Sequence, residues 1–160
     1  MRIARHILGL TAVGAAVMAL SAIPASADYG AGSAYEVEIS ANLPGSQGGG
    51  IWLWLELTPS SPGASSGTGE YSGSDCGRGK TEHAVHDSGQ VTWSVSGSTL
   101  TISDITLNGL ASVPGINPVT IELPSAYGHQ TTDFASTFPT VASALGIPSG
   151  AGFAQVQIAP

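Results

Sequence analysis

Alternating apolar and polar residues dominate the chain from about residue 34 onward. In the segment 34–41, the apolar residues Tyr35, Val37 and Ile39 alternate with polar residues. A period of two places successive side chains on opposite faces of an extended chain, so this segment is predicted to be a half-buried β-strand. The same alternation, or an apolar run bounded by turn residues, predicts further strands at 51–58, 68–74, 90–96, 99–102, 119–123 and 152–158.

The clearest hairpin is predicted at the dipeptide Gly97-Ser98, which joins two alternating segments. Glycine at the first position of a two-residue loop is typical of a type II′ turn. Beyond Ile102 the apolar positions shift by one residue, to Ile105. Such a shift would turn the apolar side chains of the second half toward water, so the sequence predicts a β-bulge at residues 103–104.

The number and length of these segments indicate the fold class. Seven or eight short strands, separated by turn residues and accompanied by at most one short helix at 138–145, are typical of an all-β protein. The sequence therefore predicts an antiparallel β-sandwich or a small barrel, and it leaves the choice between them open. Residues 28–160 are predicted to form this structure as a single domain, because a chain of this length can bury one core.

The first 27 residues have the composition of a secretory signal peptide. Basic residues precede an apolar stretch at 7–23, and the triplet Ala25-Ser26-Ala27 follows. A basic start, an apolar middle and an Ala-x-Ala end are the features that export and cleavage require, so we expect cleavage after this triplet. The mature protein is therefore predicted to be secreted and extracellular, without a membrane anchor.

The charge of the chain limits its partners. Among its 160 residues, 11 are acidic and 4 are Lys or Arg, which gives a formal net charge of -7. Two of the basic residues, Arg2 and Arg5, belong to the predicted signal peptide, so the mature chain is still more acidic. An acidic chain repels phosphate backbones, and nucleic acid is therefore excluded as the expected partner.

The single cysteine, Cys76, rules out an internal disulfide, and no cofactor is predicted.

Two tryptophans on one predicted strand form the first candidate site. Trp52 and Trp54 are two residues apart, so their rings leave the same face of the strand about 7 Å apart. Such a pair, with Glu56 beyond it as an acceptor, is predicted to bind sugar rings or another flat apolar ligand. The alternative is that this strand is central and covered on both faces, which would place the two rings in a core. Exposure of the indoles distinguishes the two interpretations.

The polar segment 75–89, predicted to be a loop, contains the second candidate site. Cys76, His83 and His86 can ligate zinc or copper, and His129 is a possible fourth ligand from elsewhere in the chain. Their spacing matches no established metal motif. The alternative is a solvated loop that gathers polar side chains without binding a metal.

Carboxylates provide two further hypotheses. A pair formed by Glu36 and Glu38 shares one face of a predicted edge strand, about 7 Å apart, which is near the separation used by retaining glycosidases. Calcium is the other hypothesis, although the chain lacks a D-x-D-x-D-G loop. Its candidate ligands are Asp75, Glu82, Asp87 and Asp133.

Several short motifs carry a resemblance to known proteins. They are Trp52-Leu53-Trp54, Gly67-Thr68-Gly69-Glu70-Tyr71, Asp75-Cys76-Gly77, Val91-Thr92-Trp93 and Leu100-Thr101-Ile102. Together with the leader, they resemble small secreted proteins of high-GC Gram-positive bacteria that have no assigned function. The hairpin motifs are also similar to those of lipocalin-like barrels, although the G-x-W signature of that family is missing. Neither resemblance implies a catalytic residue.

Three functional hypotheses follow from the sequence. The first is a non-enzymatic extracellular β domain that binds a carbohydrate or another cell-envelope component. The second is a small hydrolase or metal-dependent enzyme that uses the 75–89 segment together with His129 and Glu56. The third is a lipocalin-like carrier of a small apolar ligand, with a cavity lined by Trp54, Trp93 and Tyr71.

Overall fold

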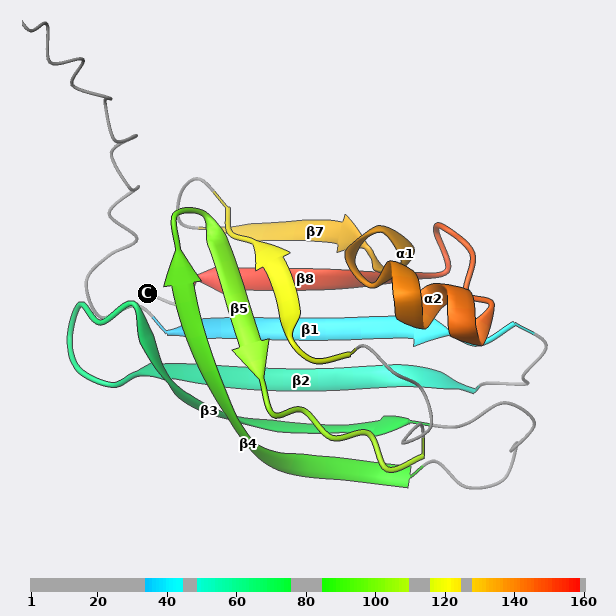
Figure 1. Cartoon of the computed structure of the whole chain (residues 1–160), viewed down its shortest axis with the longest axis horizontal. Helices are drawn as coiled ribbons and strands as arrows, with labels where there is room; N and C mark the ends of the chain where they lie inside the picture. The colour runs from blue at the N-terminus through cyan, green and yellow to red at the C-terminus, as the bar shows by residue number, and fades with distance from the viewer. Residues whose placement is uncertain (1–33, 45–48, 76–84, 110–115, 125–127, 159–160) are drawn as a thin grey trace, which may run out of the picture.

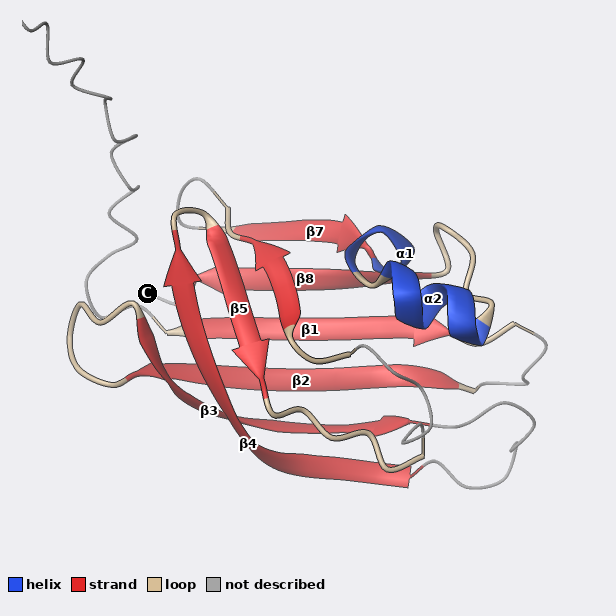
Figure 2. Cartoon of the chain, viewed as in Figure 1, coloured by secondary structure: helices blue, strands red, loops and turns tan. Residues whose placement is uncertain are grey.

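The computed structural model describes residues 34–44, 49–75, 85–109, 116–124 and 128–158, which form one antiparallel sheet and two short helices (Figures 1 and 2). This confirms the predicted all-β, antiparallel fold. The predicted signal peptide lies outside the described residues. The strands are β1 (Tyr35–Asn42), β2 (Gly50–Pro59), β3 (Ser66–Asp75), β4 (Val85–Ser96), β5 (Thr99–Ser103), β6 (Val119–Glu122), β7 (His129–Asp133) and β8 (Gly152–Ile158), and the helices are α1 (Phe134–Thr137) and α2 (Pro139–Leu145).

The strand order decides between sandwich and barrel. The eight strands are hydrogen-bonded in the order β6-β5-β4-β3-β2-β1-β8-β7, so all of them belong to a single sheet. The sheet coils into a nearly closed, barrel-like structure (Figure 1). β1 pairs with both β2 and β8, so the expectation that Glu36 and Glu38 lie on an edge strand is wrong.

The core fills the inside of the coiled sheet. In β1 and β2 every second residue is buried, and the register places Val37 opposite Leu55 and Ile39 opposite Leu53. These side chains are fully buried, as are Leu100 on β5, Val119 on β6 and Val156 on β8. The predicted period of two therefore corresponds to an apolar inner face and a polar outer face.

Trp93 links three strands inside the barrel. Its ring lies on the inner face of β4 opposite Gly67 of β3, and its Nε1 donates to the backbone oxygens of Thr58 (3.1 Å) and Thr68 (3.0 Å). A Cβ at Gly67 would lie 2.0 Å from the oxygen of Thr58, so glycine is required where β3 approaches β2 this closely. The ring edge of Trp93 also meets Tyr35, with centroids 5.2 Å apart.

The predicted hairpin is present, but at the position of the predicted bulge the ladder between β4 and β5 ends, at Ser103, instead of continuing. Gly97 has a φ of 61°, as the first position of a type II′ turn requires, and β4 and β5 pair on either side of it. β5 ends at Ser103, and Asp104 adopts a φ of 74° in the left-handed region. This irregular residue restores the inward direction of Ile105, which is buried.

The structure contains two elements that the sequence does not predict, and one predicted loop is shorter than expected. The predicted helix at 138–145 corresponds to α2, but α1 precedes it and follows directly on β7, neither of which was predicted. β7 has the sequence His-Gln-Thr-Thr-Asp, whose polar residues give no apolar alternation. The predicted loop at 75–89 is shorter than expected, because β3 includes Asp75 and β4 begins at Val85.

Asp133 connects α1 to the loop before β8. One of its carboxylate oxygens caps α1 by accepting from Ser136 N (3.1 Å), and the other accepts from Gly150 N (2.7 Å). The bond from Gly150 is the main cause that holds the pKa of Asp133 below its ordinary value, with further help from the bonds from Ser136. The charged form of Asp133 therefore stabilises this end of the fold.

We expect Trp93→Phe to lower the free energy of unfolding by about 2 kcal/mol, because it removes a buried donor shared by two carbonyls and leaves a void. Trp52→Phe is the matched control, since its N–H bond lies at the surface, and we expect a change below about 0.5 kcal/mol. Urea unfolding followed by circular dichroism measures both. Equal losses in the two variants would contradict the role assigned to Trp93.

Asp133 predicts a pH dependence of known sign. A lowered pKa in the folded state gives stability that is complete above the ordinary aspartate pKa, about 3.9, and is lost as the pH falls through the lower folded value. We therefore expect wild type to be more stable than Asp133→Asn at pH 7, and the difference to shrink below about pH 4. Urea midpoints of both proteins between pH 7 and pH 2.5 test this. A difference that stays constant over this range would contradict it.

Candidate functional site

The outer face of β2 carries the two tryptophans that the sequence singles out. Trp52 is 45% exposed, and within the described part of the chain it is the one large hydrophobic side chain that is strongly exposed. Trp54 is half-buried and Glu56 is exposed on the same face, whereas the residues between them point into the core. The interpretation that both rings pack in a core is therefore wrong. The carrier hypothesis also loses Trp54 as a cavity residue.

Two carboxylates hold the indole N–H groups. Trp52 Nε1 donates to Glu38 Oε1 (3.1 Å), and Trp54 Nε1 donates to Glu56 Oε1 (3.4 Å). The residue opposite Trp52 on β1 is Ser40, so the bond to Glu38 runs diagonally and directs the indole N–H of Trp52 toward β1. Each N–H is thus bonded at the surface, and the faces of the Trp52 ring remain open to contacts.

Acidic side chains continue this face across three strands. The register places Glu36 of β1 opposite Glu56 of β2, and Glu56 opposite Glu70 of β3. Directly opposite residues have Cβ atoms about 5 Å apart, so these carboxylates form a row beside the tryptophans. We name the set Glu36, Glu38, Trp52, Trp54, Glu56 and Glu70 the tryptophan–glutamate face.

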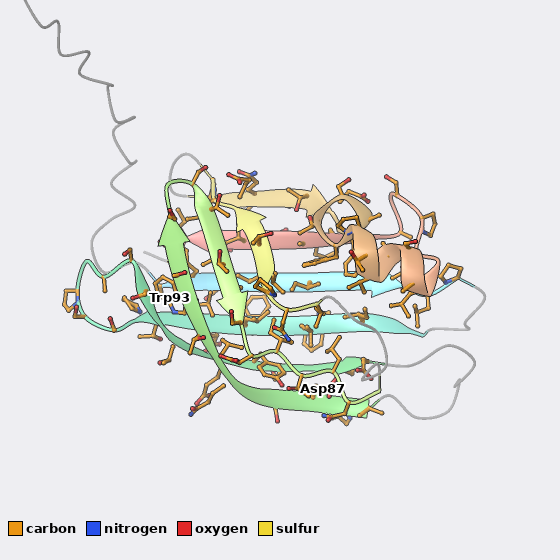
Figure 3. All side chains as sticks on the ribbon, viewed as in Figure 1. Asp87 and Trp93 are labelled. Carbon is orange, nitrogen blue, oxygen red and sulfur yellow. The ribbon has the colours of Figure 1, made fainter. Side chains whose placement is uncertain are left out.

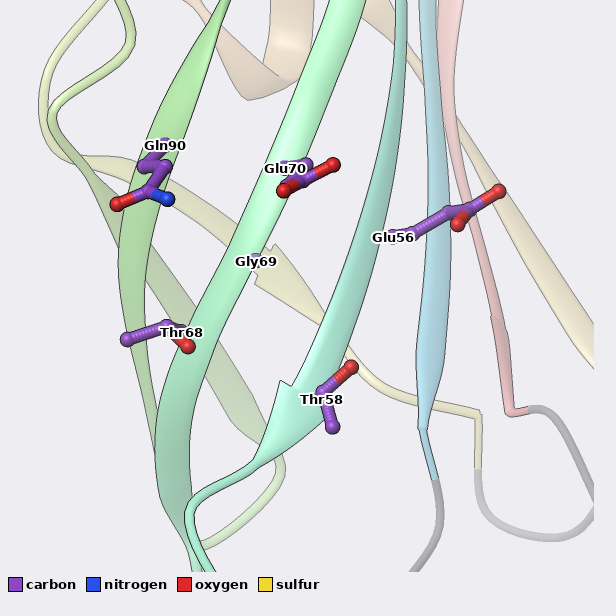
Figure 4. Close-up of a pocket in the computed structure, with 6 residues that line it drawn as sticks. All are labelled: Glu56, Thr58, Thr68, Gly69, Glu70 and Gln90. Carbon is purple, nitrogen blue, oxygen red and sulfur yellow. The ribbon is translucent and has the colours of Figure 1, made fainter.

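Two shallow hollows lie where this face crosses β3. One has a volume of about 280 Å³ and is lined by residues of β2, β3 and β4 (Figure 4). The other has a volume of about 330 Å³ and extends the first toward Trp54. Glu56 and Glu70 line both hollows, so the two are continuous. The remaining lining residues are Thr58, Thr68, Gly69 and Gln90 in the first and Trp54, Tyr71, Ser72 and Ser88 in the second.

Two buried aspartates form a separate polar cluster inside the barrel. Asp75 and Asp87 are 0% and 3% exposed, and they are diagonal neighbours on the inner faces of β3 and β4. Figure 3 shows Asp87 near the start of β4. Asp87 Oδ1 accepts from Asn108 N (3.0 Å) and Asn108 Nδ2 (2.7 Å), and Asp75 Oδ2 accepts from Gly109 N (3.0 Å). The two carboxylates therefore hold the segment after β5 against the barrel.

The candidate metal ligands do not come together. His86 is exposed on β4 and His129 is exposed on β7, with β3, β2, β1 and β8 between them in the sheet. Neighbouring strands are about 4.8 Å apart, so the backbone positions of the two histidines are far apart along the sheet. Cys76 and His83 lie outside the described residues. Among the residues that are described, no group of three or more His, Cys, Asp or Glu is placed to hold a metal ion.

Sequence reasoning found the tryptophans but missed the row of glutamates. The sequence suggests Glu36 and Glu38 as a pair along one strand and Glu56 as an acceptor beside the tryptophans, whereas it does not predict Glu70 to be a site residue. The row exists because the strands align Glu36, Glu56 and Glu70 in register, and an alternating sequence carries no signal for register between strands. The sequence names Asp75 and Asp87 only among four candidate calcium ligands, and it does not predict that they are neighbours in the barrel.

The chain does not match any protein-family model, curated protein or solved structure. The fold defines it as an all-β protein with one barrel-like antiparallel sheet. Neither described helix has the length and apolar character that crossing a bilayer requires. A function therefore has to be inferred from the residues of this chain.

The buried cluster leads to a stability prediction. We expect Asp87→Ala to lower the free energy of unfolding by about 1–3 kcal/mol, because two donors of Asn108 lose their acceptor. Asp87→Asn retains an acceptor oxygen and is expected to unfold within about 1 kcal/mol of wild type. Chemical denaturation compares the three proteins. Losses of equal size in both variants would show that the negative charge, rather than the acceptor, is required.

Proposed function

We propose that this protein is a secreted, non-enzymatic β domain that binds a carbohydrate of the cell envelope through the tryptophan–glutamate face. The observation that carries this proposal is the exposure of Trp52, 45% of which is open to solvent. Trp52 stands next to the half-buried Trp54 on the same outer face, so the two rings form one aromatic patch on an otherwise polar sheet, and contiguous exposed apolar patches are typical of binding sites.

The area available on Trp52 is sufficient for weak, specific binding. An exposed fraction of 45% corresponds to roughly 100 Å² of the indole. Covering that area contributes about 2.5 kcal/mol at about 25 cal/mol per Å². A contribution of this size changes an affinity by more than tenfold, so Trp52 alone can dominate recognition.

The surroundings of the rings suit a sugar better than a purely apolar ligand. Ser74 lies opposite Trp52 and Ser72 lies opposite Trp54 on the neighbouring strand β3. Hydroxyl and carboxylate groups beside an aromatic ring can bond sugar hydroxyls while the ring covers the apolar face of the sugar. Neither Trp52 nor Trp54 needs its N–H for the ligand, since both are already bonded to glutamates.

The enzyme hypothesis has less support. It requires His129 to act with the 75–89 segment, and four strands separate His129 from His86 in the sheet.

Extracellular location is supported by the leader pattern at 1–27 and by the acidic composition of the chain. Both features agree with a protein that meets glycans outside the cell.

Tryptophan fluorescence with a panel of soluble envelope polysaccharides tests the proposal. We expect binding to change the emission of wild type, and Trp52→Ala to weaken binding at least about tenfold, because the exposed ring supplies the covered area. Trp54→Ala is expected to weaken it less, since that ring is half-buried. Thr120→Ala, an exposed outer position of β6, is the matched control and should bind as wild type does.

Two outcomes would contradict this function. One is a wild-type protein that responds to no member of the panel in fluorescence or in titration calorimetry. The other is a Trp52→Ala protein that binds with wild-type affinity. Urea unfolding of each variant confirms that a loss of binding does not come from a loss of fold.

A further inference from the structure

The glutamates of the tryptophan–glutamate face repel one another when no ligand is bound. Glu56 has a glutamate directly opposite it on both sides, Glu36 on β1 and Glu70 on β3. Like charges at directly opposite positions of an antiparallel pair are destabilising. Glu38 adds a further carboxylate to the same face, next to Trp52.

Within the described residues, no basic side chain relieves this repulsion. All four Lys and Arg residues of the chain, Arg2, Arg5, Arg78 and Lys80, fall outside that part. The exposed His129 of β7 lies in the same cross-strand row as Glu36, two strands away through Gln157 of β8. The exposed His86 of β4 lies two strands from Trp52, through Ser74 of β3. Neither histidine lies directly opposite a glutamate. A positively charged group on a partner is therefore complementary to this face.

The hollows place the carboxylates where a ligand on the tryptophans would extend. Figure 4 shows Glu56, Glu70 and Gln90 on three neighbouring strands, with Thr58 and Thr68 beyond them. The second hollow joins Glu56 and Glu70 directly to Trp54. A ligand that begins on the aromatic rings and follows the sheet thus reaches two carboxylates and several hydroxyl or amide groups.

An organic cation fits this site better than a metal ion. The described carboxylates do not form a group of three or more that could hold a metal. An ammonium group needs no such cage, because each carboxylate can accept one charge-assisted hydrogen bond from it. The neighbouring indole attracts the same cation through the face of its ring.

From these observations we propose that the tryptophan–glutamate face selects glycans that carry free amino groups, so that the ligand is a polymer of cationic amino sugars. This inference rests on the proposed function, and it specifies the chemical class of the sugar. Trp52 and Trp54 cover the apolar faces of the sugar rings. Glu56 and Glu70 accept hydrogen bonds from the ammonium groups, and the hydroxyl and amide side chains of the hollows bond the sugar hydroxyls.

The test compares two oligosaccharides that differ only in N-acetylation, which removes the charge of the amine. Titration calorimetry of the purified protein with glucosamine oligomers and with N-acetylglucosamine oligomers of equal length measures the effect of the free amine. We expect the glucosamine oligomer to bind at least about tenfold more tightly at low salt, and the preference to diminish as ionic strength rises and screens these exposed charges. Equal affinities for the two oligomers would overturn the inference.

Variants separate this inference from the function on which it rests. Glu56→Gln with Glu70→Gln should abolish the preference for the free amine and keep weak binding of both oligomers. Trp52→Ala should weaken both. Glu122→Gln, which removes one negative charge from an exposed position of β6 outside this face, should retain the wild-type preference. A double glutamine variant that still prefers the amine would overturn the inference.

A cationic peptide provides the last comparison. Polylysine that binds as tightly as the glucosamine oligomer, with no loss in Trp52→Ala, would show a general acidic surface and would overturn the amino-sugar assignment. If neither oligomer nor any neutral glycan binds, the proposed function itself fails. If neutral glycans bind through Trp52 and the amine has no effect, the function stands and only the further inference fails.

Discussion

The structure depends on burying one face of a single sheet. The inner positions of β1 and β2 hold large aliphatic side chains, such as Leu53 and Leu55, and the sheet must coil until these side chains are enclosed. Because the coil encloses its own inner face, no second sheet is needed to cover the apolar residues. Gly67 has no side chain, so β3 can approach the Thr58 carbonyl closely. The indole of Trp93 donates to the carbonyls of Thr58 and Thr68, and so links β4 to β2 and β3.

This arrangement separates the residues that stabilise the fold from those that we propose bind a ligand. The inner face supplies the apolar burial, so the outer face of β1 to β3 is free to carry residues that contribute little to folding. Trp52 and the row of glutamates that contains Glu56 lie on this outer face. Opposed carboxylates would destabilise the fold if they were buried in the core. A rigid sheet holds these side chains in fixed register, which a loop would not do.

The sequence predicted local structure well where one face is apolar. The hairpin at Gly97 and the irregular residue near Asp104 were both predicted, because turn chemistry and a shift in the apolar pattern are local signals. β7 was missed because its residues, from His129 to Asp133, are polar and its position depends on pairing with β8. The sequence also left the exposure of Trp52 open, because a short apolar run does not show whether one face of the strand is covered or both.

In the predicted strands, the sequence itself determined which side chains share a face, because a period of two is a property of the extended backbone. The acidic character of the chain and its pair of tryptophans were determined in the same way. The tertiary structure alone decided that the strands form one coiled sheet, that Glu36, Glu56 and Glu70 share a row, and that Asp87 binds Asn108. These features depend on register and on contacts between distant segments, which are set by packing of the whole core and not by any local pattern.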